Sequence, residues 1–191
     1  MRCERCEEPA VLHVTDVRRS GELVEAHYCE PCARSHLAQA DTRAQPYTTG
    51  TRPAYHSGEV QVEVERVIIS EVHDQQVVIF REVDGERRLP FVLGIFEATT
   101  VHRTLKKLPS PRPLSHDAWL GTIAALGARL LAARIYHLQE YTYFAELRLD
   151  RNGELIRVDA RPSDALTLAL KAGAPFLIAD QLLTEASGAA N

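Results

Sequence analysis

The order of apolar and polar positions divides this chain of 191 residues into two structured parts. Apolar and polar residues alternate over 11–15 and 23–28 on either side of a glycine-containing turn, which predicts a β-hairpin. From about 41 to 58 this periodicity is lost, and proline and glycine accumulate as in an extended linker. Alternation resumes at Val60. We therefore predict a small module over 1–40, a linker over 41–58, a larger domain over 59–185 and a disordered tail over 186–191.

The larger domain mixes strands and helices without regular strand–helix alternation, so the predicted fold class is α+β. Its strands are expected at 60–69, 77–80, 89–93, 133–138, 141–149, 155–160 and 175–179. Its helices are expected over 95–108, from an N-cap at Ser115 along an apolar face to Leu131, and over 164–172 up to Gly173. The apolar stretch 138–149 is either sheet core or an edge for self-association, so a homodimer is one expectation.

All four cysteines lie within the first 32 residues. Cys3 and Cys6 form one C-x2-C pair, and Cys29 and Cys32 form a second pair after 22 intervening residues. Two such pairs, joined by a hairpin, supply the four thiolates of a tetrahedral structural Zn2+ site. Two disulfides or four free thiols are the alternative interpretation. Because four thiolates complete the coordination, we interpret the nearby histidines as surface or strand residues: His13, His27 and His36.

Charge and hydropathy limit the classes of function. The chain has 26 acidic against 22 basic side chains, which is unlike the basic footprint of a dedicated nucleic-acid-binding protein. Residues 1–45 alone carry six arginines and eight acids, so the cysteine module favours a protein partner over a phosphate backbone. No segment approaches the ~20 apolar residues that span a bilayer, and the N-terminus lacks a signal-peptide core. We expect a cytoplasmic protein that does not enter a membrane.

Several short segments of the module carry a family resemblance: Cys3-Glu-Arg-Cys6, Ala10–Thr15, Glu25–Cys29 and Cys32-Ala-Arg34. Together they resemble the N-terminal zinc ribbon of McsA-type proteins, which activate a bacterial protein arginine kinase. The resemblance covers about the first 37 residues. It implies a protein-docking module, but it does not carry kinase activation over to this chain.

Three blocks of the larger domain carry a second resemblance: Leu93–Ala98, Pro111–Asp117 and Asp159–Ala165. Their order and spacing are similar to those of the bifunctional nuclease (BFN) domain family, from about Val60 to Leu183. The family takes its name from a plant member described as cutting both DNA and RNA. The resemblance therefore implies the BFN fold and a nuclease activity.

These blocks contain the residue types that metal-dependent phosphodiester cleavage requires: carboxylates for divalent ions, a base, and cations for the phosphate. We expect catalytic roles for Glu97, His116, Asp117 and Asp164, with Mg2+ or Mn2+ as cofactor. We expect substrate phosphates to be bound by Arg112, Arg161, Lys106 and Lys107.

A structural interpretation of the same residues stays open. Asp117 and Asp164 each fall in the first turn of a predicted helix, where the helix dipole stabilises a carboxylate. A network of these acids with Arg112 and Arg161 would tie two helix starts together without any catalysis. The two lysines are likewise favoured at a helix C-terminus.

Two functions follow from these alternatives. The first is a nuclease, a phosphodiester hydrolase acting on DNA or RNA. The second is a non-catalytic adaptor or regulator, in which the ribbon binds one protein and the larger domain binds another partner or a small anionic ligand. Family resemblance favours the first, and the 18 acids against 15 basic residues over 59–191 favour the second.

Overall fold

The computed structural model describes residues 1–37 and 58–188. Its strands are β1 (Leu12–Val17), β2 (Leu23–Tyr28), β3 (Glu59–Ser70), β4 (Gln76–Glu82), β5 (Arg88–Leu93), β6 (Ala128–Gln139), β7 (Thr142–Arg151), β8 (Glu154–Ala160) and β9 (Phe176–Ala179). Its helices are α1 (Glu30–Leu37), α2 (Ile95–Leu105), α3 (Ser115–Ala125), α4 (Pro162–Ala172) and α5 (Asp180–Gly188). This mixture confirms the predicted α+β class.

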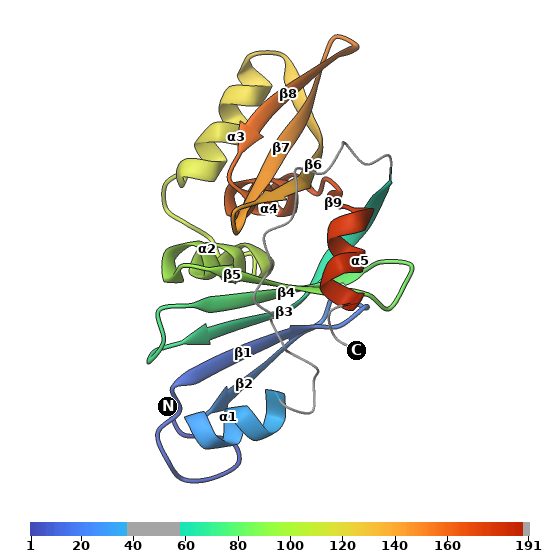
Figure 1. Ribbon diagram of the computed structural model, residues 1–191. Helices are drawn as coiled ribbons and strands as arrows, with labels where there is room; N and C mark the ends of the chain where they lie inside the picture. Colours follow the sequence, from blue (N-terminus) through green and yellow to red (C-terminus); the bar gives the residue numbers. More distant parts are fainter. Residues whose placement is uncertain (38–57, 189–191) are drawn as a thin grey trace.

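All nine strands belong to one sheet. Its main path runs β2-β1-β3-β9-β6-β7-β8, and β4 and β5 continue from β3 on the opposite side. Figure 1 shows β1, β2 and α1 at one end of the molecule, and α3, β7 and β8 at the other. The predicted linker over 41–58 lies outside the described residues except for Gly58, and α5 continues to Gly188, past the predicted domain end at 185.

Strand β3 joins the cysteine module to the rest of the sheet. Its first residues, Glu59–Val62, pair with β9, and its last residues, Arg66–Ser70, pair with β1. Strand β4 runs along the other edge of β3. The hairpin β1–β2 therefore extends the sheet of the larger domain instead of forming a separate small sheet.

The junction between the hairpin and the sheet is packed with apolar side chains. Val14 of β1 is 1% exposed and belongs to one buried cluster with Ile68 of β3 and Ile79 of β4. Cys3 and Cys29 are members of the same cluster. Burial against the sheet therefore stabilises the cysteine module in addition to any metal.

Helix α4 is the central helix of the larger domain. Pro162 occupies its first turn, two residues before the predicted start at 164. Gly173 ends the helix, as predicted, as a C-cap in the left-handed conformation with φ of 64°. Its residues Ser163–Ala169 are all buried, and the helix packs against α2 and against β6 and β7. Asp164 therefore lies in the buried first turn of α4, where a charged side chain needs a hydrogen-bonding or ion-pair partner.

Two predictions about helices were wrong. Helix α2 ends at Leu105, because Lys106 forms its C-cap and Lys107 turns into a left-handed conformation with φ of 50°. Helix α3 begins with Leu114 as N-cap and ends at Ala125, followed by Gly127 with φ of 72°. Leu131 belongs to β6, so the apparent helical face combined residues of a helix and of a strand.

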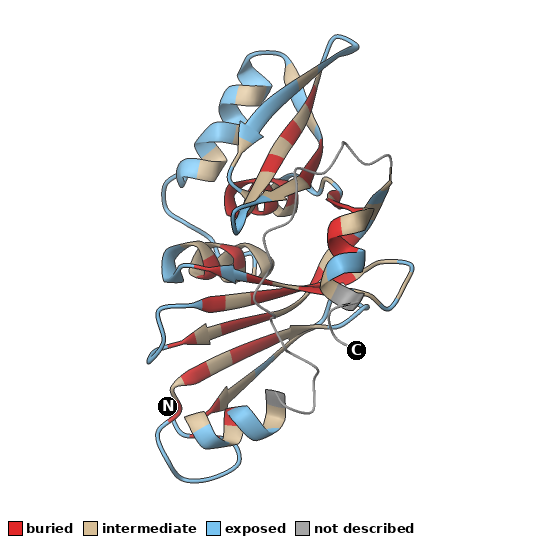
Figure 2. Ribbon diagram, in the orientation of Figure 1, coloured by how far each residue is buried: buried red, intermediate tan, exposed pale blue. Residues whose placement is uncertain are grey.

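None of the residues of α3, all of which the structure describes, is fully buried (Figure 2). Leu120 and Ile123 pack partly against the core, whereas Trp119 is 46% exposed. The helix therefore covers the sheet with one narrow stripe and leaves its other apolar side chains at the surface.

The stretch 138–149 forms the β6–β7 hairpin, whose turn residues Glu140 and Tyr141 both have positive φ. Both strands are interior strands of the sheet, and Tyr143 packs on Phe91 with ring centroids 5.1 Å apart. The sheet-core alternative is therefore confirmed for this stretch, and the free edge at this end of the sheet is β8.

Candidate functional site

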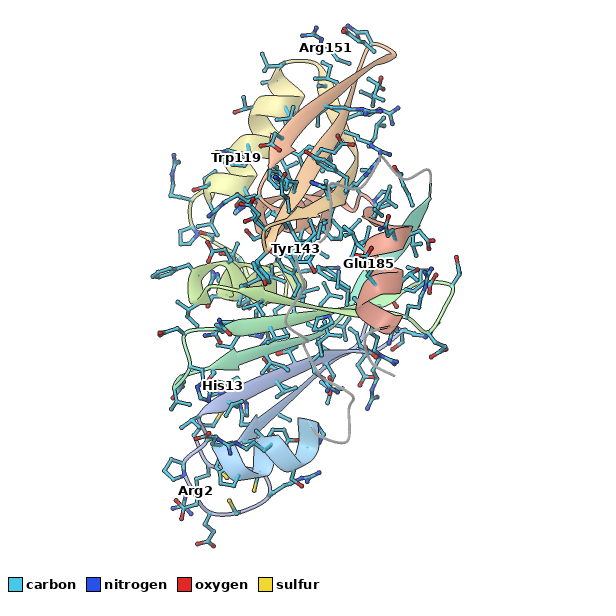
Figure 3. The ribbon with its side chains drawn as sticks, viewed as in Figure 1. Arg2, His13, Trp119, Tyr143, Arg151 and Glu185 are labelled. Carbon is cyan, nitrogen blue, oxygen red and sulfur yellow. The ribbon has the colours of Figure 1, made fainter. Side chains whose placement is uncertain are left out.

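The four cysteines form one cluster at the N-terminal end of the molecule (Figure 3). All are free thiols, and their Sγ atoms lie within 4.8 Å of one another. The Sγ atom of Cys6 is 3.5 Å from that of Cys29 and 3.7 Å from that of Cys32. A tetrahedral ion with bonds of about 2.3 Å to sulfur requires sulfur atoms about 3.8 Å apart. The cluster could therefore hold a metal ion.

Local contacts shift the pKa values of Cys3 and Cys32 in opposite directions. Burial raises the pKa of Cys3, but the N–H groups of Cys29 and Arg5 outweigh it, and the pKa is lowered to about 6. Hydrogen bonding with Cys29, together with burial, raises the pKa of Cys32 to about 12. A metal ion that binds this cluster would therefore have to displace the proton of Cys32.

The histidines of the module are not part of this cluster. His13 and His27 are cross-strand partners on β1 and β2, and their Nδ1 atoms share a hydrogen bond of 2.8 Å. His36 contacts Arg5 and the ring of Tyr28. These contacts agree with the interpretation of the histidines as strand and surface residues.

A polar contact connects the cysteine module to helix α2. Glu25 on β2 accepts hydrogen bonds from Lys106 Nζ at 2.8 Å and from His102 Nε2 at 3.0 Å. The hydrogen bond from Lys106, reinforced by that from His102, holds the pKa of Glu25 below its usual value. The side chain of Lys106, which the sequence assigned to substrate binding, is therefore occupied by the module.

Three of the four predicted catalytic residues belong to one chain of polar contacts. His116 Nε2, from the first turn of α3, donates to Asp164 Oδ1 at 3.0 Å. Arg161, the N-cap of α4, donates from Nε to Asp164 Oδ2 at 2.8 Å and from Nη1 to Glu97 Oε1 at 3.3 Å. Burial raises the pKa of Asp164, but Arg161 and His116 outweigh it, and the pKa is lowered.

The fourth predicted catalytic residue, Asp117, faces away from this chain. Its Oδ2 atom accepts the N–H of Leu114, and its Oδ1 atom accepts a hydrogen bond of 2.7 Å from Lys171. Both contacts, first that of Lys171, lower the pKa of Asp117. Asp117 therefore caps α3 and ties it to the end of α4.

The predicted Arg–Asp network forms only in part. Arg161 pairs with Asp164, but the partner of Asp117 is Lys171, which the sequence reading missed. Lys171 stands seven residues after Asp164, two helical turns along α4, and that spacing could have suggested it. Arg112 has no ion pair among the described residues and lines a surface groove with Lys171.

One exposed aromatic side chain, Trp119, contacts His116, and a second, Phe96, is the sequence neighbour of Glu97. The ring of Trp119 lies 5.7 Å from the His116 ring, and Trp119 is labelled on α3 in Figure 3. Phe96 directly precedes Glu97 and is 82% exposed. Aromatic rings at the surface can stack on nucleobases of a single strand.

The contact between His116 and Asp164 fixes which ring nitrogen is free to react. Because Nε2 donates to the carboxylate, Nδ1 is the nitrogen that can accept a proton. A histidine oriented by a buried carboxylate, beside an arginine, has the composition of a general-base site for a phosphate ester. The family model of the bifunctional nuclease domain matches residues 78–191, which include all of these side chains.

The chain belongs to the bifunctional nuclease domain family. The uncharacterized proteins MT1877 and Rv1829 of Mycobacterium tuberculosis, from strains CDC 1551 / Oshkosh and H37Rv, are similar to it. Each is 39% identical over 126 residues, which covers 66% of this chain and 75% of the relative. The cysteine cluster and β3 precede the match to the bifunctional nuclease domain.

In the part of the chain that the structure describes, only the cysteine group brings three or more metal-ligating side chains together. The guanidinium of Arg161 lies between the carboxylates of Glu97 and Asp164, where a shared divalent cation would have to bind. The predicted Mg2+ or Mn2+ site therefore does not fit this arrangement of the bifunctional nuclease domain.

Among the described helices, none has the length and apolar character to cross a bilayer.

Proposed function

We propose that the protein cleaves phosphodiester bonds of single-stranded nucleic acid, with His116 as general base and Asp164 as its positioning carboxylate. The observation that carries the proposal is the contact between His116 Nε2 and Asp164 Oδ1, with Arg161 on the other oxygen of the same carboxylate. Membership of the bifunctional nuclease domain family supports it.

Each residue of the contact chain has a separate role in this proposal. His116 Nδ1 accepts the proton of the attacking hydroxyl or water as its oxygen bonds to phosphorus, and Asp164 stabilises the imidazolium that forms. The bond between phosphorus and the leaving oxygen breaks, and that oxygen takes a proton from water. Arg161, whose side chain is 68% exposed, turns toward the phosphate oxygens. Trp119 and Phe96 offer exposed rings on which the neighbouring bases stack.

We infer that the ion of the cysteine cluster is Zn2+ with a structural role. Four thiolates at tetrahedral spacing are the donor set that zinc prefers, and they leave no position open for water. The excess of acids in the module supports a protein partner for its outer surface.

The nuclease proposal is tested with end-labelled single-stranded RNA and DNA and the full-length protein. We expect cleavage by the wild type and a loss of about 100-fold or more in His116→Ala and Asp164→Asn. The matched control is His73→Ala, because His73 lies in the β3–β4 turn and is exposed. Each variant is first checked for folding by the fluorescence of Trp119, the single tryptophan.

Equal cleavage by wild type, His116→Ala and Asp164→Asn would show that a contaminant is responsible and would reject the proposal. Absence of cleavage in the wild type would favour the adaptor function instead. Parallel reactions with EDTA, Mg2+ and Mn2+ examine the cofactor. A strict requirement for either ion would mean that Arg161 moves away from Glu97 when the ion binds.

A further inference from the structure

A groove lies between α2, α3 and α4, on the side of α3 that carries Asp117. It consists of two neighbouring cavities of about 460 and 350 Å3. The two share Leu108, Leu114, Asp117 and Lys171 in their walls. The groove is separate from the His116–Asp164 contact, because none of the residues of that contact lines it.

The groove is lined by several cationic side chains. Arg103 and Lys107 line the larger cavity and Arg112 lines the smaller one, and none of the three has an ion pair among the described residues. Elsewhere in residues 58–188 the basic side chains are paired with carboxylates, with the exception of Arg157 on β8. Three of the four unpaired cations of the larger domain therefore face one concave surface.

Among the described residues that line the groove, none offers a free carboxylate to balance these cations. Asp117 is the acidic residue in the walls, and both of its oxygens are engaged, by Lys171 and by the N–H of Leu114. Four basic side chains thus surround one carboxylate, which leaves an excess of positive charge. A concave surface with charges of one sign attracts and concentrates ions of the opposite sign.

The turn that ends α2 lies at the groove. Lys107 follows the C-cap of this helix and has φ of 50°, the left-handed conformation that commonly ends a helix. The preceding residue, Lys106, is held by Glu25 of the cysteine module. The module therefore fixes the turn that directs Lys107 into the groove.

The walls between the cations are apolar. Leu108, Leu114, Leu120 and Leu170 line the groove together with the basic residues. Cations suit a phosphate, and an apolar wall suits the face of a base or sugar, so the chemistry matches a nucleotide better than an inorganic ion. The volume of the larger cavity lies in the range of small-molecule sites.

We propose that this groove binds a phosphate-bearing nucleotide through Arg103, Lys107 and Arg112, at a site distinct from the His116–Asp164 contact. The nucleotide is either one unit of a bound strand or a free mononucleotide. The site goes beyond the proposed nuclease activity, because binding in the groove requires no cleavage.

Binding is measured with full-length protein by fluorescence anisotropy, with a labelled twelve-nucleotide single strand, and by calorimetry with AMP and ADP. The strand measurement uses the His116→Ala background, so that cleavage does not consume the probe. We expect the triple variant Arg103→Gln, Lys107→Gln, Arg112→Gln to weaken binding by about tenfold or more. Arg157→Gln is the matched control, since it removes an unpaired cation outside the groove, and we expect a change of less than about twofold.

The two nucleotide sources give different results. Binding of the strand alone identifies a strand site, and saturable binding of AMP or ADP that competes with the strand identifies a mononucleotide site. The proposal is overturned if neither probe binds, or if Arg157→Gln weakens binding as much as the triple variant. Cleavage is scored separately: loss of cleavage with intact groove binding rejects only the nuclease proposal, and cleavage with no groove binding rejects only this one.

Discussion

Replacement of Val14 by alanine tests whether the cysteine module and the larger domain unfold as one unit. Val14 is 1% exposed and packs with Ile68 and Ile79 of the larger domain's sheet. The substitution removes two buried methyl groups, each worth about 0.8 kcal/mol in transfer free energy, and leaves a cavity. We therefore expect the free energy of unfolding to fall by roughly 2–3 kcal/mol.

The assay is urea unfolding followed by the fluorescence of Trp119. This residue is the only tryptophan and lies on α3, and Figure 1 shows α3 at the opposite end of the molecule from β1, which carries Val14. A chromogenic chelator added in parallel reports metal release from the cysteines. Val72→Ala is the control, because Val72 is 53% exposed and its loss is expected to change stability by less than about 0.5 kcal/mol.

One result would refute the reasoning directly. If Val14→Ala accelerated metal release but left the Trp119 transition unchanged, the module would be an independent folding unit. The pairing of β1 with β3 would then contribute nothing to the stability of the larger domain.

Three further predictions concern the helices and the metal. Asp164→Asn should lower the free energy of unfolding by about 1–3 kcal/mol near neutral pH. Because the pKa of Asp164 is lowered in the folded state, this difference from the wild type should vanish as the pH falls through that pKa. Urea unfolding measured over a series of acidic pH values would show it. Gly173→Ala should lower the free energy of unfolding by about 1 kcal/mol, because Gly173 has a positive φ that alanine adopts only with strain. Gly121 lies inside α3 with open space around it, so Gly121→Ala should leave thermal stability unchanged or raise it. Chelation should convert unreactive cysteines into four thiols that titrate with a disulfide reagent, and full reactivity before chelation would contradict a bound ion.

Local sequence signals predicted much of this structure. The C-x2-C spacing brought Cys3 and Cys6 together with the second pair, and the Pro and Gly at the ends of α4 marked its start and its end. The proline and glycine signals depend only on residues that are close in sequence. The cysteine signal depends on four thiolates that share one tetrahedral metal site. Such features are insensitive to the rest of the fold.

Long-range pairing could not be predicted in the same way. The contact of β1 with β3 joins segments about fifty residues apart, and no local pattern shows which edge of β3 is free to accept it. The spacing of Lys171 from Asp164 could have placed both residues on one face of α4, but its contact with Asp117 depends on how α3 packs against that helix. The apolar face predicted from Trp119 to Leu131 failed because helical periodicity continued by coincidence across the turn at Gly127.

The exposed aromatic residues help to separate the two interpretations of the His116–Asp164 contact. A purely structural network needs only the ion pairs that join α2, α3 and α4, and those pairs are complete without Trp119 or Phe96. Phe96 is 82% exposed, so it adds little to the apolar core, and folding does not require it. A ring that stacks on a base must be exposed in the unbound protein. Replacement of Phe96 by alanine should therefore leave folding stability within about 0.5 kcal/mol and weaken single-strand binding, whereas unchanged binding would favour the structural network.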